Sequence, residues 1–200
     1  MPSLPLEPFV FPGDLLSEPA NGRENYGRWW VLHTRPRAEK SLARNFLRQT
    51  LPFFLPLFKR QWRSPGRRLL CSYVPLFPGY VFLCGDHQAR LVALETNLVA
   101  RVLTVEDQLQ LHVDLARVYQ LMTAGLPLTP EERLDPGTFV EIVSGPLAGL
   151  EGKILRRGKH LKLVIEVQFL QRGVSAELEG WMIRPLVGQR SAVPLAAGAR

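Results

Sequence analysis

The segment formed by residues 75–83, PLFPGYVFL, constrains the fold of this chain more than any other. Residues 81–83 are β-branched, aromatic and apolar without a polar break, which predicts a buried strand. Two prolines and a glycine lie just before it, and these residues are rare inside strands because proline lacks a backbone donor and glycine adopts unusual angles. Such a rigid segment can hold Phe77 and Tyr80 outward as an aromatic docking patch. The same rings would equally serve to cap a hydrophobic core.

The positive charge of the chain is concentrated in one region. The 200 residues carry a net charge of +7. Between residues 27 and 75 there are eleven lysines and arginines but only one acid, Glu39. A surface that is charged only for solubility mixes both signs, so this region is expected to meet a polyanion. A merely basic surface stays open as the alternative.

The first part of the chain predicts an arm, a strand and a basic helix. Residues 1–26 are proline-rich without a sustained period, which indicates a flexible arm. Residues 29–34 (WWVLHT) predict a strand, and Pro36 can open a helix that runs to about residue 49. Cations recur along one face of this helix, at Arg37, Lys40, Arg44 and Arg48. A stripe of this kind is often simply solvated.

A second basic cluster surrounds the turn signal Ser64-Pro65-Gly66, which lies between two strand-like runs. This pattern predicts a hairpin with Trp62 near its tip. The cations are Lys59, Arg60 and Arg63 before the turn, and Arg67 and Arg68 after it. Cations beside an aromatic ring suit phosphate contact and base stacking without sequence readout.

The remaining patterns divide the chain into two domains. Helices are expected at residues 87–96 and 111–122, with a strand at 98–104 between them. Residues 27–124 are therefore expected to form an α+β sandwich with an antiparallel or mixed sheet. Residues 125–136 contain three prolines and indicate a linker. Short strands punctuated by glycine over residues 137–187 predict a small β-barrel, followed by a disordered tail at 188–200.

Several functional classes are not supported by the sequence. Cys71 and Cys84 have no activating motif around them and no metal-ligand spacing, and there is no phosphate-binding GxxxxGK[ST] loop. We therefore expect no enzyme activity, no cofactor and no metal. No apolar run approaches the ~18 residues of a membrane span, and the first residues resemble no signal peptide. A cytoplasmic protein without a membrane partner is the expectation.

With both domains in view, the chain resembles the NusG family of transcription elongation factors. WWVLHTRPRAEK resembles the opening strand and helix of the NusG N-terminal (NGN) domain, and PLFPGYVFL resembles its most recognisable strand. VEIVSGPLAGLEGKILR is similar to a KOW motif, the glycine-centred hairpin of the C-terminal SH3-like barrel. The resemblance covers roughly residues 27–186. The three motifs occurring in this order are specific to the family.

The resemblance implies a factor that binds the RNA polymerase clamp and upstream or non-template DNA, as a monomer, to suppress pausing or termination. It favours docking over core capping for the two rings of the PLFPGYVFL segment. The implied polymerase-binding residues are Trp30, Phe77, Pro78 and Tyr80. The implied nucleic-acid-binding residues are Arg37, Lys40, Arg44, Arg63, Arg67 and Arg68.

The resemblance also implies a partner surface on the C-terminal barrel. Phe169, Leu170 and Arg172 take the positions that contact Rho or a small-subunit ribosomal protein in the family. Alternation along the strand leaves open that one or both of the first two are barrel core. Gln171 stands where housekeeping members commonly carry glycine. This departure bears on the shape of the loop and on the choice of partner. The stretches QLMTAGLPLTPEERLDPG and 165–172 resemble NusG-like antiterminators, and together with the N-terminal arm they favour a specialised paralogue.

A ribosome-associated RNA-binding protein that uses the KOW barrel is the alternative. It predicts the main basic surface on residues 136–186. That region has seven lysines and arginines and five acids, so its charge is far more balanced than that of residues 27–75. The charge distribution therefore favours the transcription factor.

Overall fold

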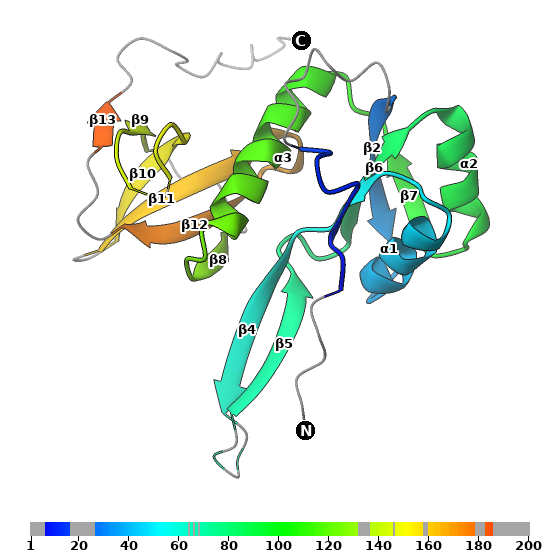
Figure 1. The fold of residues 1–200 in the computed structure, drawn as a ribbon, viewed down its shortest axis with the longest axis horizontal. Helices are drawn as coiled ribbons and strands as arrows, with labels where there is room; N and C mark the ends of the chain where they lie inside the picture. Colours follow the sequence, from blue (N-terminus) through cyan, green and yellow to red (C-terminus); the bar gives the residue numbers. More distant parts are fainter. Residues whose placement is uncertain are drawn as a thin grey trace, which may run out of the picture.

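The protein is described by a computed structural model that covers residues 7–16, 27–63, 65, 67, 69–131, 137–145, 147–157, 160–178 and 183–185. These residues form two main sheets, a separate hairpin and three α-helices (Figure 1). Among them there is no helix with the length and apolar character needed to cross a bilayer.

The N-terminal sheet has five antiparallel strands in the order β1-β3-β6-β2-β7. They are β1 (Val10–Phe11), β2 (Arg28–Thr34), β3 (Phe53–Phe54), β6 (Tyr80–Gly85) and β7 (Val99–Leu103). Strands β2 and β6 lie at the centre and pair in register, with Val31 opposite Phe82. Both are buried on their two faces, which explains why their sequences read as unbroken apolar runs.

Helices cover both faces of this sheet (Figure 1). Leu42 and Phe46 of α1 (Glu39–Arg48) and Ala93 of α2 (His87–Glu95) pack in one apolar cluster with Leu32 and Leu83 of the sheet. Helix α3 (Gln108–Thr123) packs on the opposite face, in a second cluster that also contains strand residues of the C-terminal sheet. The predicted α+β sandwich is thus confirmed, and its sheet is antiparallel.

Residues 7–16, called the N-terminal strap below, are packed against this domain. Strand β1 pairs with β3, the Leu55 N–H donates to the Phe9 carbonyl (2.6 Å), and Leu15 and Leu16 are buried. The expectation of a flexible arm is wrong for the strap, because its apolar residues complete the sheet edge and the core. Residues 1–6 and 17–26 lie outside the described residues.

The predicted hairpin is confirmed and forms a two-stranded sheet of its own. Strands β4 (Leu57–Arg63) and β5 (Leu69–Pro75) pair along their whole length, and the hairpin extends away from the rest of the molecule (Figure 1). Near its tip, 43% of Trp62 and 63% of Leu69 are exposed. Of the predicted turn, only Pro65 belongs to the described residues.

The C-terminal sheet has six antiparallel strands in the order β13-β9-β10-β11-β12-β8. They are β8 (Leu128–Glu131), β9 (Thr138–Ile142), β10 (Glu151–Arg157), β11 (His160–Val167), β12 (Arg172–Leu178) and β13 (Ile183–Pro185). A 3₁₀ turn, η2 (Gln168–Leu170), joins β11 to β12. Closure into a KOW barrel stays a prediction.

Strand β8 corrects the boundary of the predicted linker. Residues 128–131 were expected to be part of a linker, yet they pair with β12 at the edge of the C-terminal sheet. The Ser175 hydroxyl donates to the Glu131 carboxylate (2.6 Å), and both residues are buried. An edge strand tolerates the proline of this segment because one of its sides needs no hydrogen-bond donor. Residues 132–136 and the predicted tail at 188–200 lie outside the described residues.

Candidate functional site

The turn at residues 77–80 is held from two other elements. The turn closes with a hydrogen bond of 3.1 Å from the Tyr80 N–H to the Phe77 carbonyl. Gly79 has a φ of 85°, the conformation that the third position of a type II turn requires. The Gly79 N–H donates to the Glu39 carboxylate of α1 (2.8 Å), and its carbonyl accepts from the Thr34 N–H of β2 (2.8 Å). The turn is therefore fixed to α1 and to β2.

The side chains of this turn differ in exposure. Pro78 is exposed and Tyr80 is half-buried, whereas only 1% of Phe77 is exposed. The Phe77 ring meets Phe82 edge-on, with centroids 6.2 Å apart, in the cluster on the α3 face of the sheet. The expected outward orientation is thus wrong for Phe77, because the turn directs its ring into that cluster. Its part in polymerase binding stays a prediction.

The C-terminal sheet reaches this turn. The guanidinium of Arg172 in β12 lies over the Tyr80 ring, 5.5 Å from its centroid, and the His33 ring lies 5.3 Å away. Leu170 packs against the apolar cluster that contains Phe77, whereas Phe169 is partly exposed. Arg172, which the sequence assigned to the partner surface of the barrel, therefore meets Tyr80, which it assigned to polymerase binding.

Trp30 is not part of this arrangement. It lies in the cluster on the α1 and α2 face of the sheet, opposite to the face that holds Phe77. Its Nε1 donates to the Gly85 carbonyl (3.1 Å), and the guanidinium groups of Arg28 and Arg90 lie 4.7 and 5.5 Å from its ring centroid. These contacts bury the indole and complete its hydrogen bonding, so the structure separates Trp30 from the other predicted docking residues.

A buried carboxylate joins α3 to the C-terminal sheet. Only 2% of Asp114 is exposed, and its carboxylate accepts from the Gln168 N–H (2.9 Å) and the Gln110 side chain (2.7 Å). Burial raises the pKa of Asp114 to about 6, although these hydrogen bonds act in the opposite direction. An ion pair between Arg117 and Glu151 lies on the same side of the helix. Sequence reasoning missed Asp114, although an acid on the apolar face of a helix was the signal.

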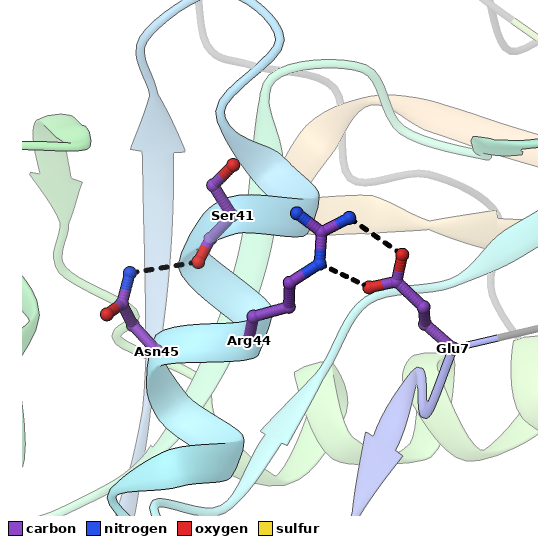
Figure 2. A network of polar contacts seen from close by, with 4 residues as sticks. All are labelled: Glu7, Ser41, Arg44 and Asn45. Carbon is purple, nitrogen blue, oxygen red and sulfur yellow. Dashed lines mark hydrogen bonds and ion pairs between the residues drawn. The ribbon is translucent and has the colours of Figure 1, made fainter.

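The basic stripe on α1 is shorter than predicted. Arg37 is exposed but precedes the helix, with a φ of 61°, so it is not part of the helical face. Lys40, Arg44 and Arg48 remain on α1. The Nε and Nη2 atoms of Arg44 each donate to one carboxylate oxygen of Glu7 in the strap, both at 2.7 Å (Figure 2). No local sequence pattern linked Glu7 to this helix.

The cations of the hairpin lie on both of its faces. Side chains alternate along a strand, so Lys59 and Arg63 share one face of β4 while Arg60 and Trp62 share the other. All four are exposed. Arg67 is exposed as well, and Arg68 lies outside the described residues. The hairpin therefore exposes cations and an aromatic ring, the kinds of group that single-stranded nucleic-acid-binding surfaces use.

The region that carries these features matches a known family. The family model described as "Transcription termination factor nusG" matches residues 27–117, which include both basic clusters and the turn. Residues 27–117 therefore form a domain of the NusG family. Factors of the NusG family are non-enzymatic transcription proteins that interact with RNA polymerase. Among the described residues there is no cluster of side chains that could hold a metal ion.

One similar solved structure is described as "Domain interaction in Thermotoga maritima NusG". It is 19% identical in sequence, covers 76% of this chain and 92% of its own, and superposes with a TM-score of 0.39. The search of curated proteins gave no match.

Proposed function

We propose that this NusG-family chain is an elongation or antitermination factor that binds the RNA polymerase clamp and upstream or non-template DNA, and thereby suppresses pausing or termination. It acts in the cytoplasm as a monomer, and as a specialised paralogue rather than the housekeeping factor. Its C-terminal sheet serves as a KOW domain that recruits a second factor, either Rho or a small-subunit ribosomal protein.

The hairpin β4–β5 is the observation that carries this proposal. It extends from the body, and its strands hydrogen-bond only to each other in the described sheets. Its exposed cations can neutralise phosphates while Trp62 stacks on an unpaired base, a contact worth about 1–3 kcal/mol. A hairpin with this composition suits the separated strands at a transcription bubble better than it suits a folded protein partner.

The polymerase contact in this proposal uses the turn at residues 77–80. Pro78 and Tyr80 offer the accessible surface, while Phe77 supports the turn from beneath. The hydrogen bond from Gly79 to Glu39 fixes the turn before binding, so little entropy is lost when a partner docks. The Arg172 guanidinium covers part of Tyr80, so this side chain must move aside before a partner can reach the whole ring.

The partner surface of the C-terminal sheet is proposed around η2 and the start of β12. Phe169 is exposed there, and Gln171 adopts a φ of 52° that turns the chain into β12. The same segment touches α3 and Tyr80, through Gln168 and Arg172 respectively. Recruitment of a second factor and release from α3 are therefore coupled in this proposal.

A paused-elongation assay with purified RNA polymerase tests the proposal. Addition of the protein should shorten the lifetime of pauses on a defined template. The triple variant Lys59→Gln/Arg60→Gln/Arg63→Gln should lose most of this effect and bind single-stranded DNA with a salt dependence weaker by about two units of slope. Arg101→Gln is the control, since it removes an exposed cation from β7. Unchanged pause lifetimes with the wild-type protein would refute the proposal.

A further inference from the structure

The strap is held in place by contacts that do not depend on Glu7. Strand β1 pairs with β3, with Val10 opposite Phe54 and Phe11 opposite Phe53. The Phe9 ring packs near Tyr119 of α3, with centroids 6.4 Å apart. These contacts fix the path of the strap, so the chain delivers Glu7 to the surface of α1.

On that surface, Glu7 binds Arg44 through two hydrogen bonds, as a phosphate group would. Its two carboxylate oxygens accept from Nε and Nη2 of the guanidinium, which form the same donor fork that binds a phosphate (Figure 2). The hydrogen bond from Arg44 lowers the pKa of Glu7, and the charges of Arg44 and Lys40 add to this effect. The carboxylate is therefore a charged group seated on the basic stripe.

The contact is open to a competing anion. The side chains of Arg44 and Glu7 are 55% and 37% exposed. Arg44 also lines a hollow in the surface of α1. The other residues around this hollow are Ser41, Asn45, Leu47 and Arg48. A phosphate can therefore approach Arg44 without any change in the core.

We propose that Glu7 occupies the place of a DNA phosphate on α1, so that the strap masks Arg44 until the DNA backbone displaces the carboxylate. The inference rests on the proposed function, since it takes DNA as the ligand of the basic surface. The inference adds an intramolecular competitor to that function. A DNA phosphate replaces the Glu7 carboxylate at Arg44, and the DNA contacts all the cations of the stripe only after Glu7 has left.

Binding of a short fluorescein-labelled duplex DNA, measured by anisotropy between about 50 and 200 mM salt, tests this inference. Glu7→Gln should bind about two- to fivefold more tightly than wild type at the low-salt end, and its salt slope should steepen by about 0.9, as for one more phosphate contact. Asp14→Asn is the matched control. It removes the same charge from an exposed position of the strap and should change affinity less.

Arg44→Gln completes the test. It should weaken DNA binding more in the Glu7→Gln background than in wild type, because only there is the guanidinium unmasked. The exchange rate of the Leu55 amide, whose N–H bonds the strap, reports whether the strap stays in place in Glu7→Gln.

The possible failures are distinct. Equal affinities of Glu7→Gln and Asp14→Asn, with the strap still in place, overturn the inference. In that case the proposed DNA contact of the hairpin still stands, provided that the hairpin triple variant loses affinity in the same assay. Absence of DNA binding by every one of these proteins overturns both proposals.

Discussion

Two carboxylates, those of Glu7 and Asp114, attach the strap and the C-terminal sheet to the N-terminal domain. One is accessible to solvent and the other is buried. Glu7 joins the strap to α1 at a half-exposed surface, and its pKa is lowered by the hydrogen bond from Arg44. Asp114 joins α3 to the C-terminal sheet in a buried position, and its pKa is raised to about 6 by burial. The same chemical group therefore favours its charged form in one contact and disfavours it in the other.

This difference predicts which agents act on each contact. Salt and competing anions reach Glu7 and weaken its attraction to Arg44. They have little access to Asp114, which instead responds to protons and to the apolar packing around it. The strap contact is thus suited to exchange with a polyanion, and the α3 contact is suited to hold two sheets together.

The largest effect is expected from the apolar packing beside Asp114. Leu115 is fully buried in the cluster that contains residues of both sheets. Leu115→Ala should lower the free energy of unfolding by about 2–5 kcal/mol, because it leaves a cavity. Arg44→Gln should change it by no more than about 1 kcal/mol, as is usual for an exposed ion pair. Urea denaturation measures both, and equal losses would contradict the contrast between the two contacts.

An intermediate effect is expected at Asp114 itself, and its sign follows from the raised pKa. Folded Asp114 titrates near 6 instead of 3.8, so the folded state binds the proton more tightly than the unfolded state does. Stability conferred by the protonated form is present below about pH 4 and is lost as the pH rises to about 6. Asp114→Asn has no charge to bury and keeps an acceptor for the Gln168 N–H.

The variant Asp114→Asn should therefore be more stable than wild type by about 1–3 kcal/mol at pH 7, since each pK unit corresponds to about 1.4 kcal/mol. The difference should disappear near pH 4. Thermal unfolding across this pH range measures it. Parallel pH profiles of the two proteins would show that Asp114 does not titrate as the structure implies.

The smallest effect is expected when salt alone is varied. Between about 0.05 and 0.5 M salt, screening should speed the exchange of the Leu55 amide, which bonds the strap, by no more than about fivefold. The Gln168 amide, which bonds Asp114, should exchange at the same rate throughout. Hydrogen exchange followed by NMR reports both amides in one sample, and an equal response would remove the distinction.

Local patterns were sufficient to predict the elements of the N-terminal domain. The unbroken apolar runs of β2 and β6 have that character because both faces of the sheet are covered. The hairpin followed from the Ser-Pro-Gly turn signal between two runs of strand-forming residues. The basic character of the hairpin could also be predicted, because no acidic residues lie near its cations in the sequence.

Contacts between distant segments could not be predicted in the same way. The strap reads as an irregular proline-rich stretch, since its two-residue strand depends on β3 for its hydrogen bonds. The burial of Phe77 depends on the packing of α3 against the sheet, which the turn sequence does not encode. Likewise, residues 128–131 become a strand only because β12 offers an edge.

The independence of the hairpin gives it reach. Seven residues in each strand, at about 3.3 Å per residue, correspond to a ribbon of about 23 Å. The major groove of B-DNA is about 8.5 Å deep and admits a two-stranded ribbon. In the proposed function, this length lets the tip reach a duplex or an open strand while the body is docked on the polymerase. Because no helix packs along the ribbon in Figure 1, its tip can acquire a new sequence preference without any rebuilding of the domain behind it.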